Sequence, residues 1–563
     1  MKKINNLKPL ITALVLALPA VAIHAQSTVP NAGSILKQVQ PNASVKPSSA
    51  AAAVESITEQ SVAPLAATAP FLVRKISITG NKKVSTEILQ ALVADAEGKS
   101  LTLAQLDKVI FRITEYYNSH GFPLARAIIP AQTIADGVVK IQIIVANYGK
   151  VKLANASRVN DGLLIATLSN LKPGDEIEQA GLDRALLLLS DLPGVIASGS
   201  LAPGSEVGTS DLSVSVTPGA SITGNLMGDN YGNSYTGRLR AGGTVSFVDP
   251  LNLKTSDILT LSGLSSGVNM QYGRISYESV INGEGSRLGA AYSDLHYKLG
   301  GGVESANARG NAQVNSLWVK QPLMRSRDIN VYAQIQADGL TLRDHSGNVD
   351  FKDRSLKVWT ASLSGDFRDD MASGGVTSWN VGLTKGRVTI DNAEILGYDA
   401  LGLKTAGGFS KWNANASRLQ RLYDKTSLFV SGTGQLSNKN LDSSQKMTVG
   451  GANTVRAYDS GAVSGDSGYS LTAELRQDFG SVFEGQLQGI AFADAAKIKK
   501  NHTPISLIES NIDNLQGVGL GLNWSGANQW NAKTYIATPI GSVPSSVGTT
   551  STTRAWLEMA KGF

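Results

Sequence analysis

The C-terminal part of the chain consists of short segments that alternate between apolar and polar residues. Between residues 220 and 563, turns rich in Gly, Asn, Asp and Ser separate these segments. In residues 331–338, for example, Val, Ala, Ile and Ala alternate with Tyr, Gln, Gln and Asp. Because successive side chains of a strand point to opposite faces, such a strand needs an apolar medium on one side and water on the other. We count about 16 such segments, an even number, as in single-chain bacterial membrane barrels.

The last alternating segment, residues 554–563, supports the same interpretation. It places Ala555, Leu557 and Met559 on one face and ends on Phe563. Together with the preceding segments it predicts a transmembrane antiparallel β-barrel over residues 219–563. A terminal aromatic strand resembles the signal by which bacterial outer-membrane barrels are recognised for assembly.

One segment of the barrel, residues 469–479, follows an unusually long loop. Its polar face carries Ser470, Thr472, Glu474, Arg476 and Asp478, its apolar face carries Tyr469, Leu471, Ala473, Leu475 and Phe479, and the alternation slips once at Gln477. The glycine-rich loop before it, residues 449–468, holds a single arginine, Arg456. If the first strand leaves the N-terminal domains, this loop is the sixth at the far end of the barrel. At about 30 residues between strands, it is long enough to fold back into the lumen.

The pattern changes to strands mixed with amphipathic helices in residues 71–218. Residues 71–149 predict the order strand, helix, helix, strand, strand, with a helix beginning after Ser85 and a second helix that ends at Gly121. Residues 150–218 repeat most of this plan, with a closing strand at residues 212–216. We therefore predict two α+β domains. Each has few strands and hence open strand edges, to which an extended chain can add by backbone hydrogen bonding.

The N-terminal residues predict three further segments. Residues 1–25 combine a positive start, an apolar core and small residues, which is typical of a secretory signal cleaved after Ala22 or Ala25. Residues 32–40 can form a short amphipathic helix with Ile35, Leu36 and Val39 on one side. The remainder of residues 26–70 is rich in Ala, Ser, Val and Pro, the composition of a flexible linker.

Composition narrows the classes of function. The chain has 58 Gly, no Cys and a net charge of +6 that is spread along the sequence, which does not favour nucleic-acid binding. The five histidines show no pair at ligand spacing, so we expect neither metal nor other cofactor. The GDSG at residues 465–468 and the G-x-S-x-G at residues 263–267 lack the surroundings that their mechanisms need, so we do not expect an enzyme.

The sequence VRAYD, which is Val455, Arg456, Ala457, Tyr458 and Asp459, resembles the VRGY-type motif of transporters that join POTRA domains to a barrel. With two POTRA-like units, the chain resembles the two-partner secretion transporters, the TpsB family. This resemblance implies that the loop at residues 449–468 lies in the lumen and that the helix at residues 32–40 plugs it.

The resemblance also suggests a partner for Arg456. Phe492 and Asp494 lie two residues apart on one face of a later strand and resemble the F-x-D motif of the family's lumen wall. We expect a bidentate bridge between Arg456 and Asp494, because an unpaired guanidinium away from bulk water is costly. Two points stay open: Ala457 stands where the family often has glycine, and Arg456 could instead be a solvated loop charge.

The fold class predicted is mostly β, with a plug helix, two α+β POTRA domains and a barrel of about 16 strands in the bacterial outer membrane. By resemblance, the function is translocation of one large exoprotein, such as an adhesin, a haemolysin or a contact-dependent growth inhibition toxin, without nucleotide hydrolysis. The POTRA domains would bind its N-terminal secretion domain. Other implied partners are outer-membrane lipid and lipopolysaccharide, and the barrel-assembly machinery during biogenesis, with the transporter itself monomeric. The alternatives are a passive porin, a barrel-assembly or insertion factor, and a soluble adhesin or enzyme.

Overall fold

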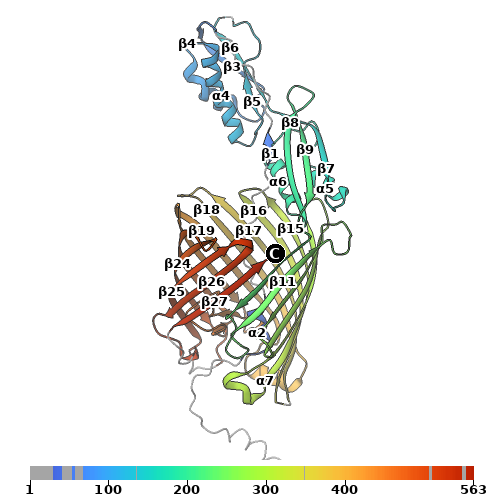
Figure 1. The fold of residues 1–563 in the computed structure, drawn as a ribbon, viewed down its shortest axis with the longest axis vertical. Helices are drawn as coiled ribbons and strands as arrows, with labels where there is room; N and C mark the ends of the chain where they lie inside the picture. The colour runs from blue at the N-terminus through green and yellow to red at the C-terminus, as the bar shows by residue number, and fades with distance from the viewer. Residues whose placement is uncertain are drawn as a thin grey trace, which may run out of the picture.

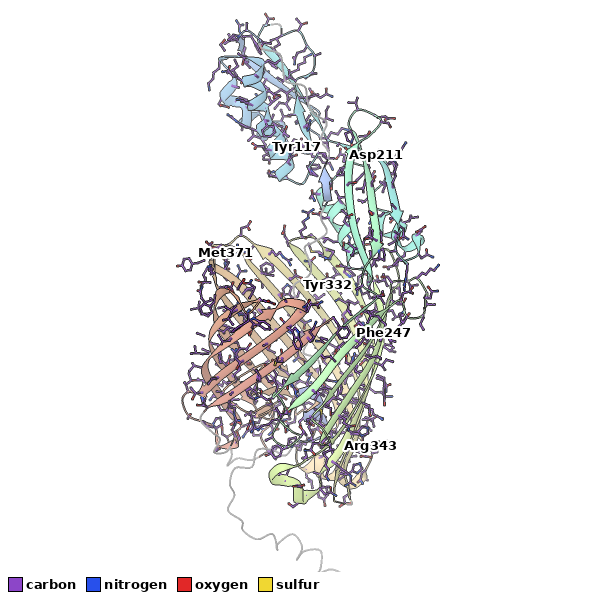
Figure 2. The ribbon with its side chains drawn as sticks, viewed as in Figure 1. Tyr117, Asp211, Phe247, Tyr332, Arg343 and Met371 are labelled. Atoms are coloured by element: carbon purple, nitrogen blue, oxygen red, sulfur yellow. The ribbon has the colours of Figure 1, made fainter. Side chains whose placement is uncertain are left out.

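The computed structural model describes residues 30–40, 54–57, 68–134, 136–347, 349–505, 510–547 and 553–563, with the backbone alone at residues 54–57 and 349–352. The predicted signal peptide at residues 1–25 and most of the predicted linker lie outside these residues. Two small domains lie one after the other beyond one end of a large barrel (Figure 1). Figure 2 places Met371 at the barrel end that faces these domains and Arg343 toward the opposite end.

The barrel is closed and antiparallel, and it contains 16 strands, which confirms the predicted fold class. Its first half comprises β10 (Ile222–Asp229), β11 (Arg240–Val248), β12 (Ile258–Ser265), β13 (Met270–Val280), β14 (Arg287–Lys298), β15 (Arg309–Arg325), β16 (Ile329–Ser346) and β17 (Val349–Asp369). Its second half comprises β18 (Gly375–Ile390), β19 (Gly407–Tyr423), β20 (Thr426–Ser437), β23 (Ser467–Val482), β24 (Gly485–Lys499), β25 (Ile512–Gly526), β26 (Trp530–Pro539) and β27 (Arg554–Gly562). The last strand pairs with the first, from Asn225 opposite Gly562 to Asp229 opposite Glu558, and so closes the barrel.

The two faces of the barrel strands follow the alternation in the sequence. On β23 the side chains of the apolar face, such as Leu471, Leu475 and Phe479, are exposed on the outer surface. On β16 the polar residues Gln334, Gln336 and Asp338 line the cavity inside the barrel. The slip expected near Gln477 is a bulge, since the pairing of β23 with β24 shifts register between Asp478 and Gly480.

The first small domain contains a three-stranded sheet in the order β3-β6-β5 and a separate β2–β4 pair. Its elements are β2 (Phe71–Val73), β3 (Lys75–Thr79), α3 (Thr86–Val93), η1 (Ala94–Ala96), β4 (Lys99–Leu101), α4 (Leu103–Ser119), β5 (Arg126–Ile128) and β6 (Val138–Ile144). Leu106, Ile110 and Ile113 of α4 are buried against the sheet, as their spacing predicts. Gly121, where the helix was expected to stop, follows it with a φ of 91°.

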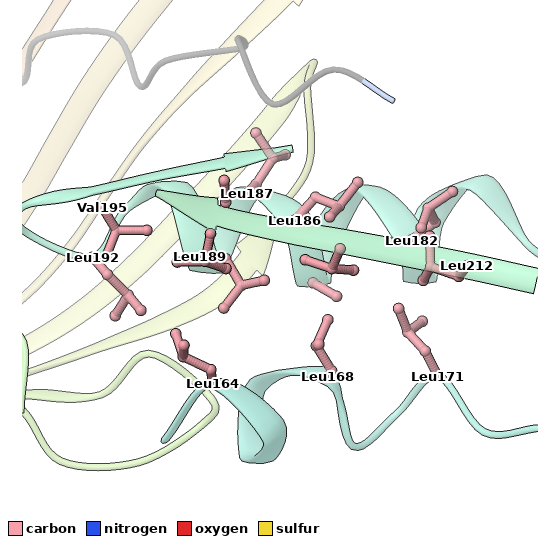
Figure 3. Packing of buried hydrophobic residues seen from close by; sticks show 14 of the residues in the cluster. Leu164, Leu168, Leu171, Leu182, Leu186, Leu187, Leu189, Leu192, Val195 and Leu212 are labelled. Atoms are coloured by element: carbon pink, nitrogen blue, oxygen red, sulfur yellow. The ribbon is translucent and has the colours of Figure 1, made fainter. Parts of the chain in front are cut away.

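The second small domain contains a four-stranded sheet in the order β1-β8-β9-β7, with α5 (Asp161–Leu168) and α6 (Gln179–Ser190) packed on it. Its strands are β1 (Val54–Ile57), β7 (Asn147–Asn155), β8 (Val195–Pro203) and β9 (Thr209–Pro218). Figure 3 shows the leucines of both helices meeting those of the sheet in its core, which also includes Leu201 and Leu212.

Two features of this second sheet correct the sequence analysis. The sequence pattern missed β8, because its inward positions include the small residues Ala197 and Gly199, which give a weak apolar signal. The prediction of a linker was wrong for residues 54–57, which form β1 and pair parallel to β8 at Gly199, Ser200 and Leu201. Backbone hydrogen bonding to an open edge requires little from side chains, so composition could not reveal it.

The second domain is fixed to the barrel by charged contacts. Arg325, at the end of β15, donates from Nε and Nη2 to the Asp191 carboxylate at 2.7 and 2.8 Å, and its side chain is fully buried. Arg327, in the turn that follows, contacts Asp183 at 2.7 Å. A further ion pair joins Arg184 and Glu284 at 2.9 Å. Because a bidentate pair fixes the relative geometry of its two partners, the Arg325–Asp191 pair in particular orients this domain against the barrel.

Two helices belong to the barrel region. The predicted plug helix, α2 (Ala32–Val39), lies inside the barrel, and α7 (Ala393–Leu401) lies outside it at the end away from the two domains (Figure 1). Among the described residues, no helix is both long and apolar enough to cross a membrane.

Candidate functional site in the barrel lumen

A long connection between β20 and β23, residues 438–466, folds back into the barrel; we call it the lumen loop. β20 and β23 are the eleventh and twelfth strands of the barrel, so this is the sixth connection at the end away from the small domains, as predicted. Within it, β21 (Met447–Val449) pairs with β22 (Val463–Gly465). The apolar residues of the loop are buried against the inner faces of β24, β25 and β26, where they meet Ile490, Phe492, Ala496, Ile498, Leu515 and Ala537.

Arg456 lies at the centre of this contact. Its Nε and Nη2 donate to the two carboxylate oxygens of Asp494 at 2.9 and 2.8 Å, so the bridge has the bidentate geometry expected from the sequence. The backbone N–H of Arg456 also donates to Asp494, at 3.1 Å. The arginine side chain is 4% exposed and that of Asp494 is fully buried. The guanidinium is therefore paired inside the barrel rather than solvated.

Further groups on the wall complete this environment; the sequence identified Phe492 among them, but not Glu474 or Thr472. Arg456 Nη1 donates to Glu474 at 2.7 Å, and Thr472 donates to Asp494 at 2.9 Å. The guanidinium lies 3.4 Å from the centre of the Phe492 ring, a cation–π distance. Glu474 and Thr472 belong to the polar face of residues 469–479, so their presence near the loop could have been inferred from alternation, although their partner could not.

The other residues of the motif also contact the wall. Trp556 of β27 donates from Nε1 to the backbone oxygen of Arg456 at 2.7 Å. Asp459 pairs with Arg238 at 2.7 Å and with Arg554 at 2.5 Å. Val455, Ala457 and Tyr458 are buried in the apolar cluster beneath the loop. Trp556 carried a usable signal, because it is an aromatic residue on the lumen face of the last strand.

Ala457 fits its place because the wall opposite it is glycine. A Cβ built on Gly517 would lie 2.4 Å from the Ala457 Cβ, closer than two carbons can approach. The neighbouring Gly519 and Gly521 similarly leave room for the rings of Phe492 and Tyr535. This row of glycines on β25 therefore provides room in the barrel wall.

The plug helix α2 occupies a second apolar area of the inner wall. Ile35 and Leu36 are buried against side chains of β13 to β19, and Val39 packs at the margin of this cluster. At its first turn, the Asn31 side chain accepts from the Ser34 N–H at 3.1 Å and caps the helix. The helix thus lies against the wall opposite the surface that holds Arg456.

A polar cavity of about 1100 Å³ remains in the barrel between these two areas. Plug residue Lys37, wall residues Gln336, Asp338 and Lys411, and Asn453 and Thr454 of the lumen loop line it. Within the part of the chain that the structure describes, no group of three or more His, Cys, Asp or Glu side chains is placed to hold a metal ion. The arrangement is that of a polar lumen narrowed by a helix and a loop.

Comparisons with known proteins place this architecture. A family model described as haemolysin secretion/activation protein ShlB/FhaC/HecB matches residues 208–524, and a POTRA domain model of the ShlB type matches residues 71–145. The heme/hemopexin transporter protein HuxB of Haemophilus influenzae is 29% identical over 490 residues, 86% of this chain and 85% of HuxB. The outer membrane transporter CdiB of Escherichia coli is 22% identical over 435 residues, 75% of this chain and 72% of that relative.

Solved structures agree in fold. CdiB from Escherichia coli superposes with a TM-score of 0.69 at 20% identity, covering 91% of this chain and 94% of that structure. The family match covers more than half of the chain, and the POTRA model matches the first of the two domains before the barrel; the POTRA domains of this family lie in the periplasm. The chain belongs to the ShlB/FhaC/HecB family of haemolysin secretion/activation proteins, and it is an outer-membrane transporter that secretes a partner exoprotein by the two-partner route.

Proposed function

We propose that this transporter carries one large exoprotein through the barrel lumen. During transport the plug helix α2 leaves the lumen, and the lumen loop stays on the wall. The observation that carries the proposal is the contrast inside the lumen. The lumen loop is held at its centre by a buried arginine with two carboxylate partners, whereas α2 is a helix of eight residues held by one apolar face and by hydrogen bonds near its two ends. The cargo is proposed to be an adhesin, a haemolysin, a contact-dependent growth inhibition toxin or a similar large exoprotein.

In this proposal the POTRA domains capture the cargo by strand addition. Open strand edges accept extended chains through backbone hydrogen bonds, with little demand on sequence. In the second POTRA domain the β8 edge carries β1, which pairs at three positions of a nine-residue strand. We propose that a strand from the secretion domain of the cargo replaces β1 on this edge, because the longer pairing outcompetes the shorter one.

The lumen then opens when α2 withdraws. Arg456 and Asp494 keep the lumen loop on its wall during transport, so the loop forms one side of the passage instead of blocking it. No catalytic step is proposed, and the driving force is the folding of the cargo outside the cell. The apolar outer face of the barrel is proposed to contact lipid and lipopolysaccharide, the barrel-assembly machinery inserts it, and the transporter works as a monomer.

Single-channel conductance in planar bilayers tests the plugged pore. The full mature protein is compared with a variant that lacks residues 26–70. We expect small, flickering currents from the former and large, steady currents from the latter. Equal large currents from both proteins would contradict the plug and favour a passive porin. Binding of many nascent barrels, with no secreted partner, would favour the assembly-factor alternative.

A further inference from the structure

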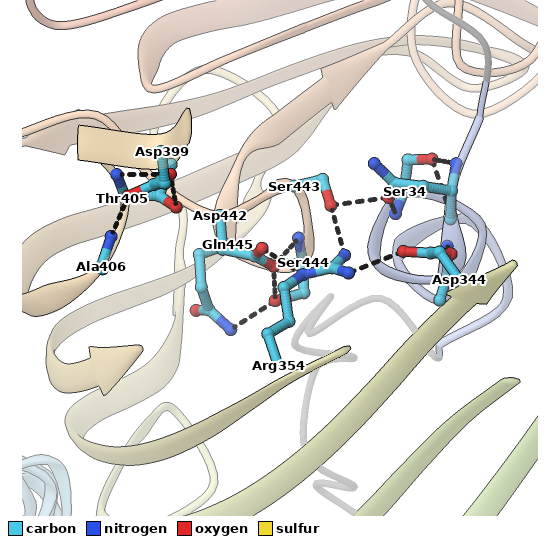
Figure 4. Close-up of polar contacts among 12 residues, drawn as sticks. Ser34, Asp344, Arg354, Asp399, Thr405, Ala406, Asp442, Ser443, Ser444 and Gln445 are labelled. Carbon is cyan, nitrogen blue, oxygen red and sulfur yellow. Dashed lines mark hydrogen bonds and ion pairs between the residues drawn. The ribbon is translucent and has the colours of Figure 1, made fainter. Parts of the chain in front are cut away.

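A second buried ion cluster lies in the barrel, apart from Arg456, and it contacts the plug. Arg354 of β17 donates from Nη1 to Asp344 of β16 at 2.6 Å and from Nε to Asp442 of the lumen loop at 2.5 Å. Its Nη2 also donates to Ser443 at 3.1 Å. The Arg354 side chain is fully buried, and those of Asp442 and Asp344 are 1% and 7% exposed. Figure 4 shows the guanidinium between the barrel strand and the loop.

The same cluster holds the first turn of the plug helix. The backbone N–H of Ala32 donates to Asp344 Oδ1 at 2.8 Å, and Tyr297 donates to the same oxygen at 2.5 Å. On the loop side, Ser443 donates to the Asn31 side chain at 2.6 Å. The helix and the loop are in close contact here, since a Cβ built on Gly33 would lie 2.6 Å from the Ser444 nitrogen. Asp344 therefore binds both the helix and Arg354.

Charge explains why these contacts depend on one another. One guanidinium faces two carboxylates, which leaves about one negative charge in excess, and the exposed N–H groups of a helix N-terminus carry about half a positive charge. The Ala32 N–H thus supplies part of the compensation that Asp344 needs in this buried position. If α2 leaves, Asp344 loses that donor; if Arg354 is lost, two buried carboxylates remain close together without their cation.

The cluster also differs from the Arg456 site in what it connects. Arg456 binds the middle of the lumen loop to β23 and β24, whereas Arg354 binds the first residues of the loop to β16 and β17. Only the second of these contacts includes the plug helix. A movement of residues 442–443 can therefore reach α2 while Arg456 stays in place.

We propose that Asp344, Arg354 and Asp442 form a latch that keeps α2 in the lumen. The latch couples release of the helix to movement of residues 442–443 of the lumen loop. This inference rests on the proposed function, in which α2 closes the pore. The latch holds the resting state closed and takes no part in passage of the cargo. Opening it frees the helix without detaching the loop from Asp494.

The test measures single-channel currents of the full mature protein and of Arg354→Met, Asp442→Asn and Arg343→Gln variants. Arg343 is the matched control, because it precedes Asp344 on β16 and has a half-exposed side chain 3.9 Å from Asp353. We expect Arg354→Met to raise the open fraction at least about tenfold, toward that of the protein without residues 26–70, and Asp442→Asn to raise it less. Asp442→Asn keeps the size of the side chain, so it covers the case in which Arg354→Met fails to assemble. Arg343→Gln should behave as the unmodified protein.

A second background separates the latch from the plug itself. In the protein without residues 26–70, the latch substitutions should change the current no further, since the helix is absent. An additional increase there would show that they act on the barrel or the loop and would overturn the latch. Failure of the deletion to open the pore refutes the proposed plug, whereas an open deletion with unchanged latch variants refutes the latch alone. Asp442→Asn should still secrete the partner exoprotein, and loss of secretion in that variant would also contradict the proposal.

Discussion

The plug helix and the centre of the lumen loop pack on different areas of the same inner wall, and they are held there in different ways. The loop is held through Arg456 by two carboxylates, an aromatic ring and the indole of Trp556, all on strands of the barrel. The plug is held by an apolar stripe of one short helix and by contacts at its first turn. The loop is thus fixed at its centre by ion pairs, and the plug by apolar packing and by hydrogen bonds near both of its ends.

The two kinds of contact indicate which element can move. An interior cation with several charged partners is costly to remove, because each partner is left buried and uncompensated. An apolar helix face can transfer to another surface as a unit once its end contacts are broken. We therefore expect the lumen loop to stay on the barrel wall and α2 to leave it.

The largest expected effect is that of Arg456→Ala. It leaves Asp494 buried without its cation and Glu474 with Arg476 as its remaining one. Loss of a buried cation of this kind costs about 3–5 kcal/mol, so the lumen loop should detach. We expect loss of secretion with normal insertion of the barrel, measured by exoprotein in the medium and by heat-modifiable migration. Arg476→Gln is the matched control, since Arg476 donates to the other oxygen of Glu474, Oε2, and lies over the ring of Phe429 on β20. Normal secretion by Arg456→Ala would falsify the role assigned to this arginine.

The next largest effect is expected from weakening the apolar packing of the plug helix. Leu36→Ala removes a fully buried side chain from the apolar stripe, at a cost of about 2–5 kcal/mol in typical cores. The pore should open more often in bilayers, while secretion continues. The exposed Leu403→Ala serves as the control and should leave the current unchanged. If the current of Leu36→Ala equals that of the unmodified protein, the contacts at the first turn are enough to retain the helix.

A smaller effect is expected where the loop meets the wall. Gly517→Ala places a methyl group against Ala457, and overpacking of this kind costs about 1–3 kcal/mol. Secretion should fall, and the double variant Gly517→Ala with Ala457→Gly should restore it. The same secretion assay measures both proteins. If the double variant is as defective as the single one, the contact between these two residues is not what limits the loop.

The smallest effect is that of Asn31→Ala at the cap of the plug helix. Loss of a cap costs about 1 kcal/mol, and here the contact with Ser443 is lost as well. We expect a several-fold rise in brief openings. Asn31→Ser retains a capping oxygen and should stay closer to the unmodified protein. An effect as large as that of Leu36→Ala would mean that the contacts at the first turn hold the helix as strongly as its apolar stripe does.

The fold could be predicted from the sequence where one face of an element is polar and the other apolar. The alternation of β16 and β23 gave the barrel, and the three-four spacing of α4 gave the first POTRA domain. The strands β1 and β8 were not predicted, because β1 is defined by backbone pairing alone and β8 has small inward residues.

The bridge between Arg456 and Asp494 could be proposed because both residues belong to recognisable motifs. The cluster of Asp344, Arg354 and Asp442 has no motif, and only the closed barrel brings these strands and the loop together. Its one signal in the sequence is indirect. Leu340 and Leu342 continue the lumen face of β16 after three polar residues, which indicates that something apolar covers the wall at that height.

Strand β1 gives the departing helix a tether. Fourteen residues, 40–53, connect α2 to β1, and a chain of that length spans at most about 50 Å. While β1 is paired with β8, a helix that leaves the lumen remains attached near the barrel, at an effective concentration in about the millimolar range. Its return is an intramolecular step, so resealing after each cargo depends on the length of this tether and not on the abundance of the transporter.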